Sequence, residues 1–232
     1  WTLGAFLLLL SGRAAFEAGE VRLGKGKGRF VAAVSVVLSG GAMVDPLIAM
    51  LLAGLWMVLW GRLIGLPWRG DSLLKKGAEL AVYPVLPLAL LRFGAMDEGL
   101  RPLVLLAYIL IETFDSYALV FGKLFGKRHA FPVLSPRKTI EGLVGGAVSL
   151  VVTVVVIASV MELSVSGAAL LAILAGGLGL AGDLTASRLK RCGGVKDYPV
   201  VLGQQGGALD IFDSWIAAGA GLSVMFVIAG LA

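Results

Sequence analysis

Acidic and basic side chains gather in residues 182–214 of an otherwise apolar chain. A charged side chain near the centre of a bilayer costs about 2.5–3.5 kcal/mol on insertion scales, so charges kept there usually bind an ion or a substrate. Asp210 and Asp213 are three residues apart, and on a helix such residues share a face. Two carboxylates on one face suit Mg²⁺, which one or two carboxylates and substrate phosphates commonly hold. Asp183, at the end of another apolar run, is a third candidate ligand.

Two glycines, Gly206 and Gly207, stand directly before this acidic pair. Glycine lets the backbone come close to a ligand, and a helix N-terminus that is left open binds anions. The sequence therefore predicts an open, anion-binding start to the last helix. The alternative is that Asp210 and Asp213 are a solvated pair of helix-capping acids.

A second acidic group, Glu112 and Asp115, lies inside the apolar run 103–121 and precedes a basic loop. The segment 135–139 is expected to open the following helix, and cations beside a helix N-terminus suit a polyphosphate. Residues 187–191 could form a second basic helical face. Taken singly, each cation is better explained as a topological anchor, whereas the pattern as a whole favours phosphate. The candidate phosphate-binding residues are Lys123, Ser135, Lys138, Thr139, Ser187, Lys190, Arg191 and Lys196.

Carboxylates for a metal and cations for phosphates, at one membrane edge, describe phosphoryl or nucleotidyl transfer to a lipid. Such chemistry depends on charge neutralisation and in-line positioning more than on covalent catalysis. The sequence contains no GxxxxGK[ST] motif, so a nucleotide site would be of another kind. The single histidine, His129, lies in a basic loop, and the single cysteine, Cys192, excludes an intramolecular disulfide.

These residues must be positioned by membrane helices. Hydrophobic residues make up 58% of the chain and charged residues 15%, against about 25% charged in soluble domains. Runs close to 20 apolar residues predict an all-α, polytopic membrane bundle of about eight spans. The second and third are short and could instead form a re-entrant pair. The first lacks a basic flank, so it is interpreted as a shortened helix and not as a complete signal peptide. The expected spans are 1–12, 30–44, 47–61, 77–92, 101–121, 139–161, 166–186 and 209–231.

The cations alternate between the connections. All but Arg92 and Arg101 of the 20 lysines and arginines fall in four connections that the expected spans place on one side. The positive-inside rule assigns that side to the cytoplasm, which accounts for the net charge of +5 without nucleic acid. We expect an N-terminal helical part, 1–92, and a catalytic part, 93–232. We expect the protein to span an inner cell membrane, with loops 122–138 and 187–208 of the catalytic part on the cytoplasmic side.

Two blocks of sequence resemble a known family. Residues 182–185 (GDLT), 187–197 (SRLKRCGGVKD) and 206–214 (GGALDIFDS) are similar to the signature of phosphatidate cytidylyltransferases, also called CDP-diacylglycerol synthases. The block 115–127 (DSYALVFGKLFGK), followed by 135–146 (SPRKTIEGLVGG), also resembles them. The family usually has Gly-His-Gly-Gly before the paired acids, whereas this chain has Gln204 and Gln205 before the two glycines. Ile211 stands where an arginine is common.

The resemblance implies Mg²⁺-dependent transfer of CMP from CTP to phosphatidic acid, with a second cation left open. CTP, phosphatidic acid and membrane lipids would be the partners, and a homodimer is also left open. The implied catalytic residues are Asp183, Lys190, Lys196, Asp197, Asp210 and Asp213, with Asp183, Asp210 and Asp213 as metal ligands. The implied substrate-binding residues are Asp115, Lys123, Ser135, Lys138, Thr139, Ser187, Arg191, Gln205, Gly206 and Gly207.

Two alternatives remain open at this point. Intramembrane acids with a basic vestibule would also fit a transporter or a lipid-moving protein. An inactive relative, or one with a different lipid acceptor, would fit the changes at Gln205 and Ile211, because glutamine can be neither a cation nor a general base.

Overall fold

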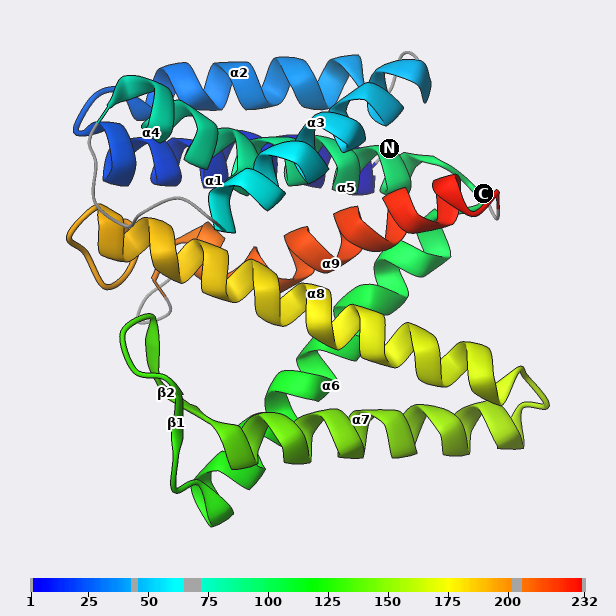
Figure 1. Cartoon of the computed structure of the whole chain (residues 1–232). Helices are drawn as coiled ribbons and strands as arrows, with labels where there is room; N and C mark the ends of the chain where they lie inside the picture. Colours follow the sequence, from blue (N-terminus) through cyan, green and yellow to red (C-terminus); the bar gives the residue numbers. More distant parts are fainter. Residues whose placement is uncertain (1, 43–45, 65–71, 202–205, 231–232) are drawn as a thin grey trace.

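The computed structural model describes residues 2–42, 46–64, 72–201 and 206–230, and these fold almost entirely into helices (Figure 1). The expected all-α membrane fold is confirmed. The elements are α1 (Thr2–Leu23), α2 (Gly28–Gly41), α3 (Pro46–Ile64), α4 (Leu73–Leu80), the π-helical turn η1 (Ala81–Val85), α5 (Leu86–Met96), α6 (Arg101–Phe125), β1 (His129–Phe131), β2 (Ser135–Thr139), α7 (Ile140–Val160), α8 (Val165–Cys192) and α9 (Ala208–Ile228).

Five helical segments among the described residues are long and apolar enough to cross a membrane. They are Leu73–Met96, Arg101–Phe125, Ile140–Val160, Val165–Cys192 and Ala208–Ile228. In hydrocarbon every backbone polar group must be satisfied internally, so even the valine-rich α7 is helical. Shorter apolar helices cover Gly28–Gly41 and Leu47–Trp60, as the sequence predicted for its second and third segments.

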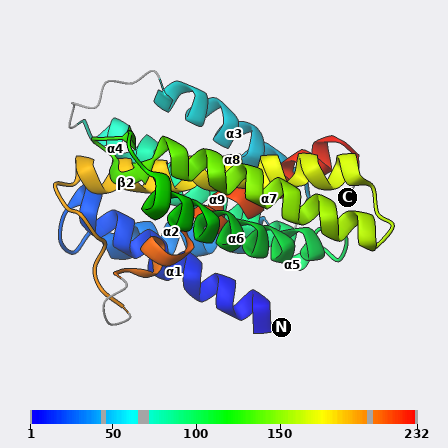
Figure 2. The same ribbon diagram turned by 90° about the horizontal axis from the view of Figure 1, so that it is seen from below.

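The helices differ in how deeply they lie in the bundle. In α9, 67% of the apolar window is buried inside the protein, whereas in α7 only 17% is. Helix α9 packs against α5, α6 and α8, and α7 contacts mainly α6 and α8. Figure 2 shows α3 at one edge of the bundle and the start of α1 at the opposite edge. The central α9 is therefore held on several sides, and α7 presents most of its surface outward.

The segment from α4 to α5 is one helical body with a kink. Pro84 lacks the backbone N–H that a helix needs, and Tyr83 leaves helical geometry with φ −158° and ψ 122°. The kink turns the Tyr83 side chain into the core, where only 2% of the residue is exposed. The boundary expected between residues 92 and 93 falls inside α5, and the division into two parts stays a prediction.

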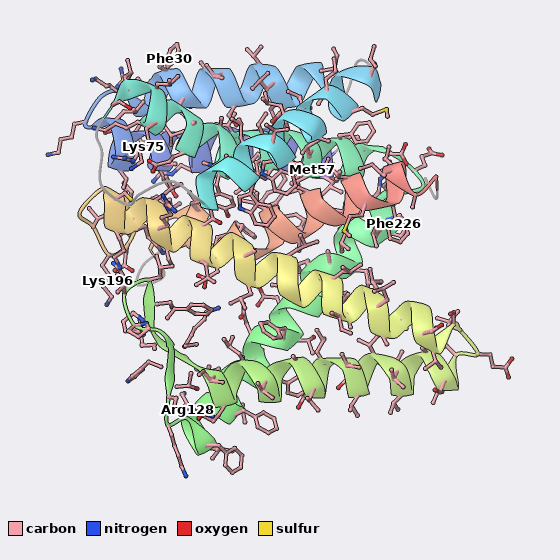
Figure 3. All side chains as sticks on the ribbon, viewed as in Figure 1. Phe30, Met57, Lys75, Arg128, Lys196 and Phe226 are labelled. Atoms are coloured by element: carbon pink, nitrogen blue, oxygen red, sulfur yellow. The ribbon has the colours of Figure 1, made fainter. Side chains whose placement is uncertain are left out.

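The basic connections gather at one end of the bundle, as the cation pattern predicted (Figure 1). The α1–α2 turn, the start of α4, the β-hairpin and the end of α8 all lie there, and Lys75, Arg128 and Lys196 mark this basic end in Figure 3. The α5–α6 and α7–α8 connections lie at the other end.

Two local predictions were wrong. The segment 135–139 does not open a helix but forms β2, paired antiparallel with β1, and α7 begins after it. Thr139 accepts a hydrogen bond from Gly142 N and caps α7, so the helix starts at residue 140 and not at 139 as expected. Helix α1 also continues to Leu23, through much of the polar connection expected at 13–29.

Candidate active site

Lys138 forms ion pairs with aspartates on two different helices at the basic end of the bundle. Its Nζ lies 3.0 Å from Asp183 Oδ2 on α8 and 3.6 Å from Asp115 Oδ1 on α6. Lys138 comes from β2, so the hairpin that sequence reasoning did not predict delivers this cation. The three residues are far apart in sequence, and the fold brings them together as expected for a site that combines acids and cations.

The carboxylates hold Lys138 in its charged form. Burial alone would lower the pKa of Lys138, but the negative charges of Asp183 and Asp115 more than offset it, so its pKa is raised above the ordinary 10.5. Lys138 therefore carries a full positive charge at neutral pH, as a phosphate-binding cation requires.

Asp183 and Asp213 both lie at a close contact between α8 and α9, formed at Gly182. A Cβ added at Gly182 would lie 2.4 Å from Ala217 Cβ and 2.9 Å from the Asp213 carbonyl oxygen, so only glycine allows this approach. Asp213 is 7% exposed, and its Oδ1 accepts hydrogen bonds from Ser214 N at 2.6 Å and Ser214 Oγ at 3.3 Å. The crossing brings two acidic residues of different helices to one place.

Asp210 has a different set of contacts. Its Oδ1 lies 2.6 Å from Lys190 Nζ, and its Oδ2 accepts from Tyr198 N at 2.8 Å and Gly207 N at 3.0 Å. Lys190 Nζ also lies over the Tyr198 ring, 5.4 Å from its centroid. Asp210 therefore caps α9 and ties its start to α8 and to the loop between them.

The start of α9 is not open, and that expectation was wrong. The N–H groups of Ala208 and Leu209 donate to Glu17, and that of Gly207 donates to Asp210. Two carboxylates of the protein thus occupy the place that an anionic ligand would take. Gly207 serves this closed arrangement, because an added Cβ would lie 2.4 Å from Glu17 Oε2.

Whether a divalent cation fits here depends on which carboxylate oxygens are not already used in hydrogen bonds. Within the described residues, no group of three or more acidic, histidine or cysteine side chains is close enough to hold a metal, so the three-aspartate cluster is not formed. Both oxygens of Asp210 are used. Asp183 Oδ2 is buried and has the Lys138 ion pair but no hydrogen bond. Asp183 and Asp213 are therefore the two carboxylates left as candidate ligands for a cation that completes its shell with phosphate oxygens.

The other predicted residues fall into three groups. Arg191 joins the end of α8 to the hairpin, through Nη1 to Val195 O at 3.0 Å and Nη2 to Leu134 O at 3.4 Å. Ser187 is buried on α8, and Ser135 and Thr139 are half-buried in β2. Three residues at the basic end are exposed and form no ion pair with a described residue; they are Lys123, Lys196 and Asp197. Glu112 is exposed on α6, and Gln205 lies outside the described residues.

Three buried residues near the aspartates were not predicted. Tyr83 Oη donates to the Asp213 carbonyl oxygen at 2.8 Å, and Tyr198 Oη donates to the Ala186 carbonyl oxygen at 3.2 Å. Burial raises the pKa of Tyr198 well above 10, and Asp210 adds to the effect, so the hydroxyl stays protonated. Glu17, on α1, is fully buried. The spacing of Arg13 and Glu17, four residues apart on one helix, was the only sequence signal for it.

Comparison with known sequences shows the family of the chain. Residues 26–229 match the sequence profile of the Cytidylyltransferase family, and the chain belongs to that family. The match includes every predicted site residue. It begins after α1, so Arg13 and Glu17 lie outside the matched segment.

Curated relatives carry a more specific name. The chain is 39% identical over 126 residues to a phosphatidate cytidylyltransferase of Staphylococcus haemolyticus, a match that covers 53% of this chain and 48% of the relative. It is 36% identical over 129 residues to a phosphatidate cytidylyltransferase of Staphylococcus aureus strain COL, with the same coverage. The resemblance seen in the sequence motifs is thus confirmed. The chain spans about half the length of the curated relatives it matches.

Proposed function

We propose that this chain transfers CMP from CTP to phosphatidic acid, giving CDP-diacylglycerol and pyrophosphate. The observation that carries the proposal is the half-buried junction of Lys138 with Asp183 and Asp115, at the basic end of a membrane bundle of the cytidylyltransferase family. The acceptor is taken from the names of the relatives, which are phosphatidate cytidylyltransferases.

The transfer needs little covalent help from the protein. A phosphate oxygen of phosphatidic acid forms a bond to the α-phosphorus of CTP. The bond from that phosphorus to the bridging oxygen breaks, and pyrophosphate leaves with the electron pair. A phosphate monoester is largely ionised near neutral pH, so no general base has to remove a proton. A glutamine at position 205 is compatible with this chemistry.

The protein's task is to bind and align two anions. Lys138 carries a positive charge beside the α8–α9 crossing. Its partners are the carboxylates of Asp183 and Asp115, and the phosphates of a cation-bound triphosphate can take their place. Lys123 and Lys196 are exposed at the same end and supply further positive charge for the phosphates of CTP. Lys190 stays with Asp210, so its role is to fix the start of α9.

Asp183 and Asp213 would hold Mg²⁺ at this site. When bound, the ion would neutralise charge on the phosphates of CTP and favour departure of pyrophosphate. Asp210, which the sequence suggested as a third ligand, is proposed instead to keep Asp213 in place by capping α9.

The membrane setting supports a lipid acceptor. Five helices could span a bilayer, and the candidate site lies at the end of the bundle that carries most of the cations. By the positive-inside rule we place this end in the cytoplasm, at an inner cell membrane, where CTP is available. A lipid phosphate at the membrane surface would reach the site from the side.

The test is product formation by the purified protein in detergent micelles. With phosphatidic acid, CTP and Mg²⁺, we expect CDP-diacylglycerol and pyrophosphate in equal amounts. Product with a different lipid phosphate alone would keep the nucleotidyl transfer and change the acceptor. No CTP-dependent product with any lipid phosphate would overturn the proposal and favour an inactive relative or a lipid-moving protein.

A further inference from the structure

Glu17 on α1 makes the contacts that determine where α9 begins. The residue is fully buried, and its two carboxylate oxygens accept from Ala208 N and Leu209 N, each at 2.9 Å. These N–H groups belong to the first turn of α9 and have no partner within the helix. Helix α1 packs against α9 (Figure 1). A side chain from α1 thus completes the start of α9, which lies near the other end of the chain.

Arg13 holds this carboxylate in place and reaches the loop before α9. Its Nε lies 2.7 Å from Glu17 Oε1, and its Nη2 donates to the Pro199 carbonyl oxygen at 3.2 Å. One turn of α1 therefore fastens both Pro199 and the first residues of α9. A buried carboxylate with a cation and two backbone donors is well satisfied, so the arrangement is stable without a ligand.

The first turn of α9 carries the residues on which the candidate site depends. Asp210 is the third residue of α9, and Asp213 stands one turn further along. A shift of the helix start would move Asp213 relative to Asp183, and a displacement of about 1 Å in a catalytic constellation can cost about a hundredfold in rate.

We propose that Glu17 is a positioning residue for the transfer reaction, acting through the first turn of α9. This inference rests on the proposed function. Lys138, Lys123 and Lys196 stand on other elements and supply most of the positive charge for CTP, whereas the Mg²⁺ that Asp213 would help to hold matters most for departure of pyrophosphate. Binding of CTP should therefore depend less on Glu17 than turnover does. The loss of Glu17 should therefore lower kcat and leave the KM for CTP nearly unchanged.

Glu20 supplies a matched control on the same helix. Its carboxylate accepts from Gly26 N at 2.8 Å and Gly28 N at 2.9 Å, so it performs the same task for the start of α2. Both of these hydrogen bonds come from the start of α2 and the turn before it, and neither involves α9. Glu17→Gln and Glu20→Gln therefore make the same chemical change at two different helix starts.

The test combines turnover with hydrogen exchange, using the full chain in detergent. Glu17→Gln places an amide NH₂ against backbone donors. We expect amide exchange in residues 206–215 at least tenfold faster, kcat at least tenfold lower and the KM for CTP within threefold of wild type. Glu20→Gln should instead speed exchange in residues 26–30 and keep kcat within twofold. Arg13→Gln, which leaves the carboxylate in place, should lower kcat two- to fivefold and serves if Glu17→Gln does not fold.

Two results would overturn the inference. One is unchanged exchange of residues 206–215 in Glu17→Gln, which would show that Glu17 does not hold α9. The other is an equal loss of kcat in Glu17→Gln and Glu20→Gln, which would indicate general destabilisation. If wild type makes no CTP-dependent product, the proposed function fails, and the exchange measurement still decides whether Glu17 fixes the start of α9.

Discussion

Asp210 and Asp213 are three residues apart but have different surroundings. Asp210 is bound by Lys190 and two backbone N–H groups, whereas Asp213 keeps one oxygen outside its bonds to Ser214. Spacing alone predicted two equivalent metal ligands. The contacts instead assign Asp210 to the architecture of α9 and leave Asp213, with Asp183, for the proposed cation.

The two aspartates should therefore differ in their effect on stability. Asp210→Asn leaves Lys190 buried without its counter-charge, and removing one partner of a buried ion pair costs about 3–5 kcal/mol. Asp213→Asn keeps the side-chain oxygen that accepts from Ser214 N, and should cost less than about 1 kcal/mol. Thermal unfolding in one detergent would measure the difference. An equal Tm for the two variants would contradict this division of roles.

Lys138 gives a prediction about pH. Its pKa is raised in the folded protein, so the stability it contributes is fully present below its ordinary pKa of 10.5 and is lost as pH rises through the higher folded value. The Tm difference between wild type and Lys138→Met should stay constant from about pH 7 to 9 and shrink only above about 10.5. A difference that shrinks between pH 7 and 9 would show that Lys138 is not held charged by Asp183 and Asp115.

At the scale of elements, the α8–α9 crossing is the contact that brings acids together. Gly182→Ala would place a methyl group against Ala217 and the Asp213 backbone, and overpacking of this kind costs about 1–3 kcal/mol. We expect a lower Tm and a loss of turnover larger than the loss of stability explains, because Asp183 and Asp213 move apart.

Gly177 on the same helix is the control for this substitution. A Cβ there meets no described atom within 4 Å, and alanine is a better helix former than glycine by about 1 kcal/mol. Gly177→Ala should thus keep wild-type turnover and an equal or higher Tm. If Gly182→Ala behaved in the same way, close approach of α8 and α9 would not be required for the site.

The connections give a prediction about topology. Cys192 ends α8, and Arg128 lies in the connection between α6 and β1, both at the basic end of the bundle (Figure 3). In sealed vesicles, an impermeant maleimide should label Cys192 and, after Cys192→Ala, Arg128→Cys from one and the same side. Glu98→Cys, between α5 and α6, should be labelled from the opposite side. Labelling of positions 128 and 192 from opposite sides would contradict the arrangement.

At the scale of the whole molecule, the sequence predicted the helices better than the contacts between them. The run that forms α7 was predicted almost to the residue, because an apolar segment of this length has few options in lipid. The β-hairpin was missed because a three-residue strand carries no periodic pattern. The capping of α9 by Glu17 was also missed, since it joins residues 191 positions apart.

The candidate site was predicted in the same uneven way. The motifs pointed to Asp183, Lys138 and Asp213, which the fold brings to one end of the bundle. They did not separate Asp210 from this group, because a helix-capping aspartate and a metal-binding aspartate look alike in a sequence. Burial and hydrogen-bond partners make that distinction.

The most direct measurement follows the phosphorus atoms of CTP into the product. Wild-type protein with phosphatidic acid and Mg²⁺ should place label from the α-phosphorus of CTP in the lipid and label from the γ-phosphorus in pyrophosphate. Asp183→Asn and Asp213→Asn, folded as judged by their Tm, should reduce the lipid label by at least about a hundredfold, a loss of about 2.7 kcal/mol or more in transition-state stabilisation. Label from the γ-phosphorus in the lipid, or near-normal transfer by both variants, would contradict the account.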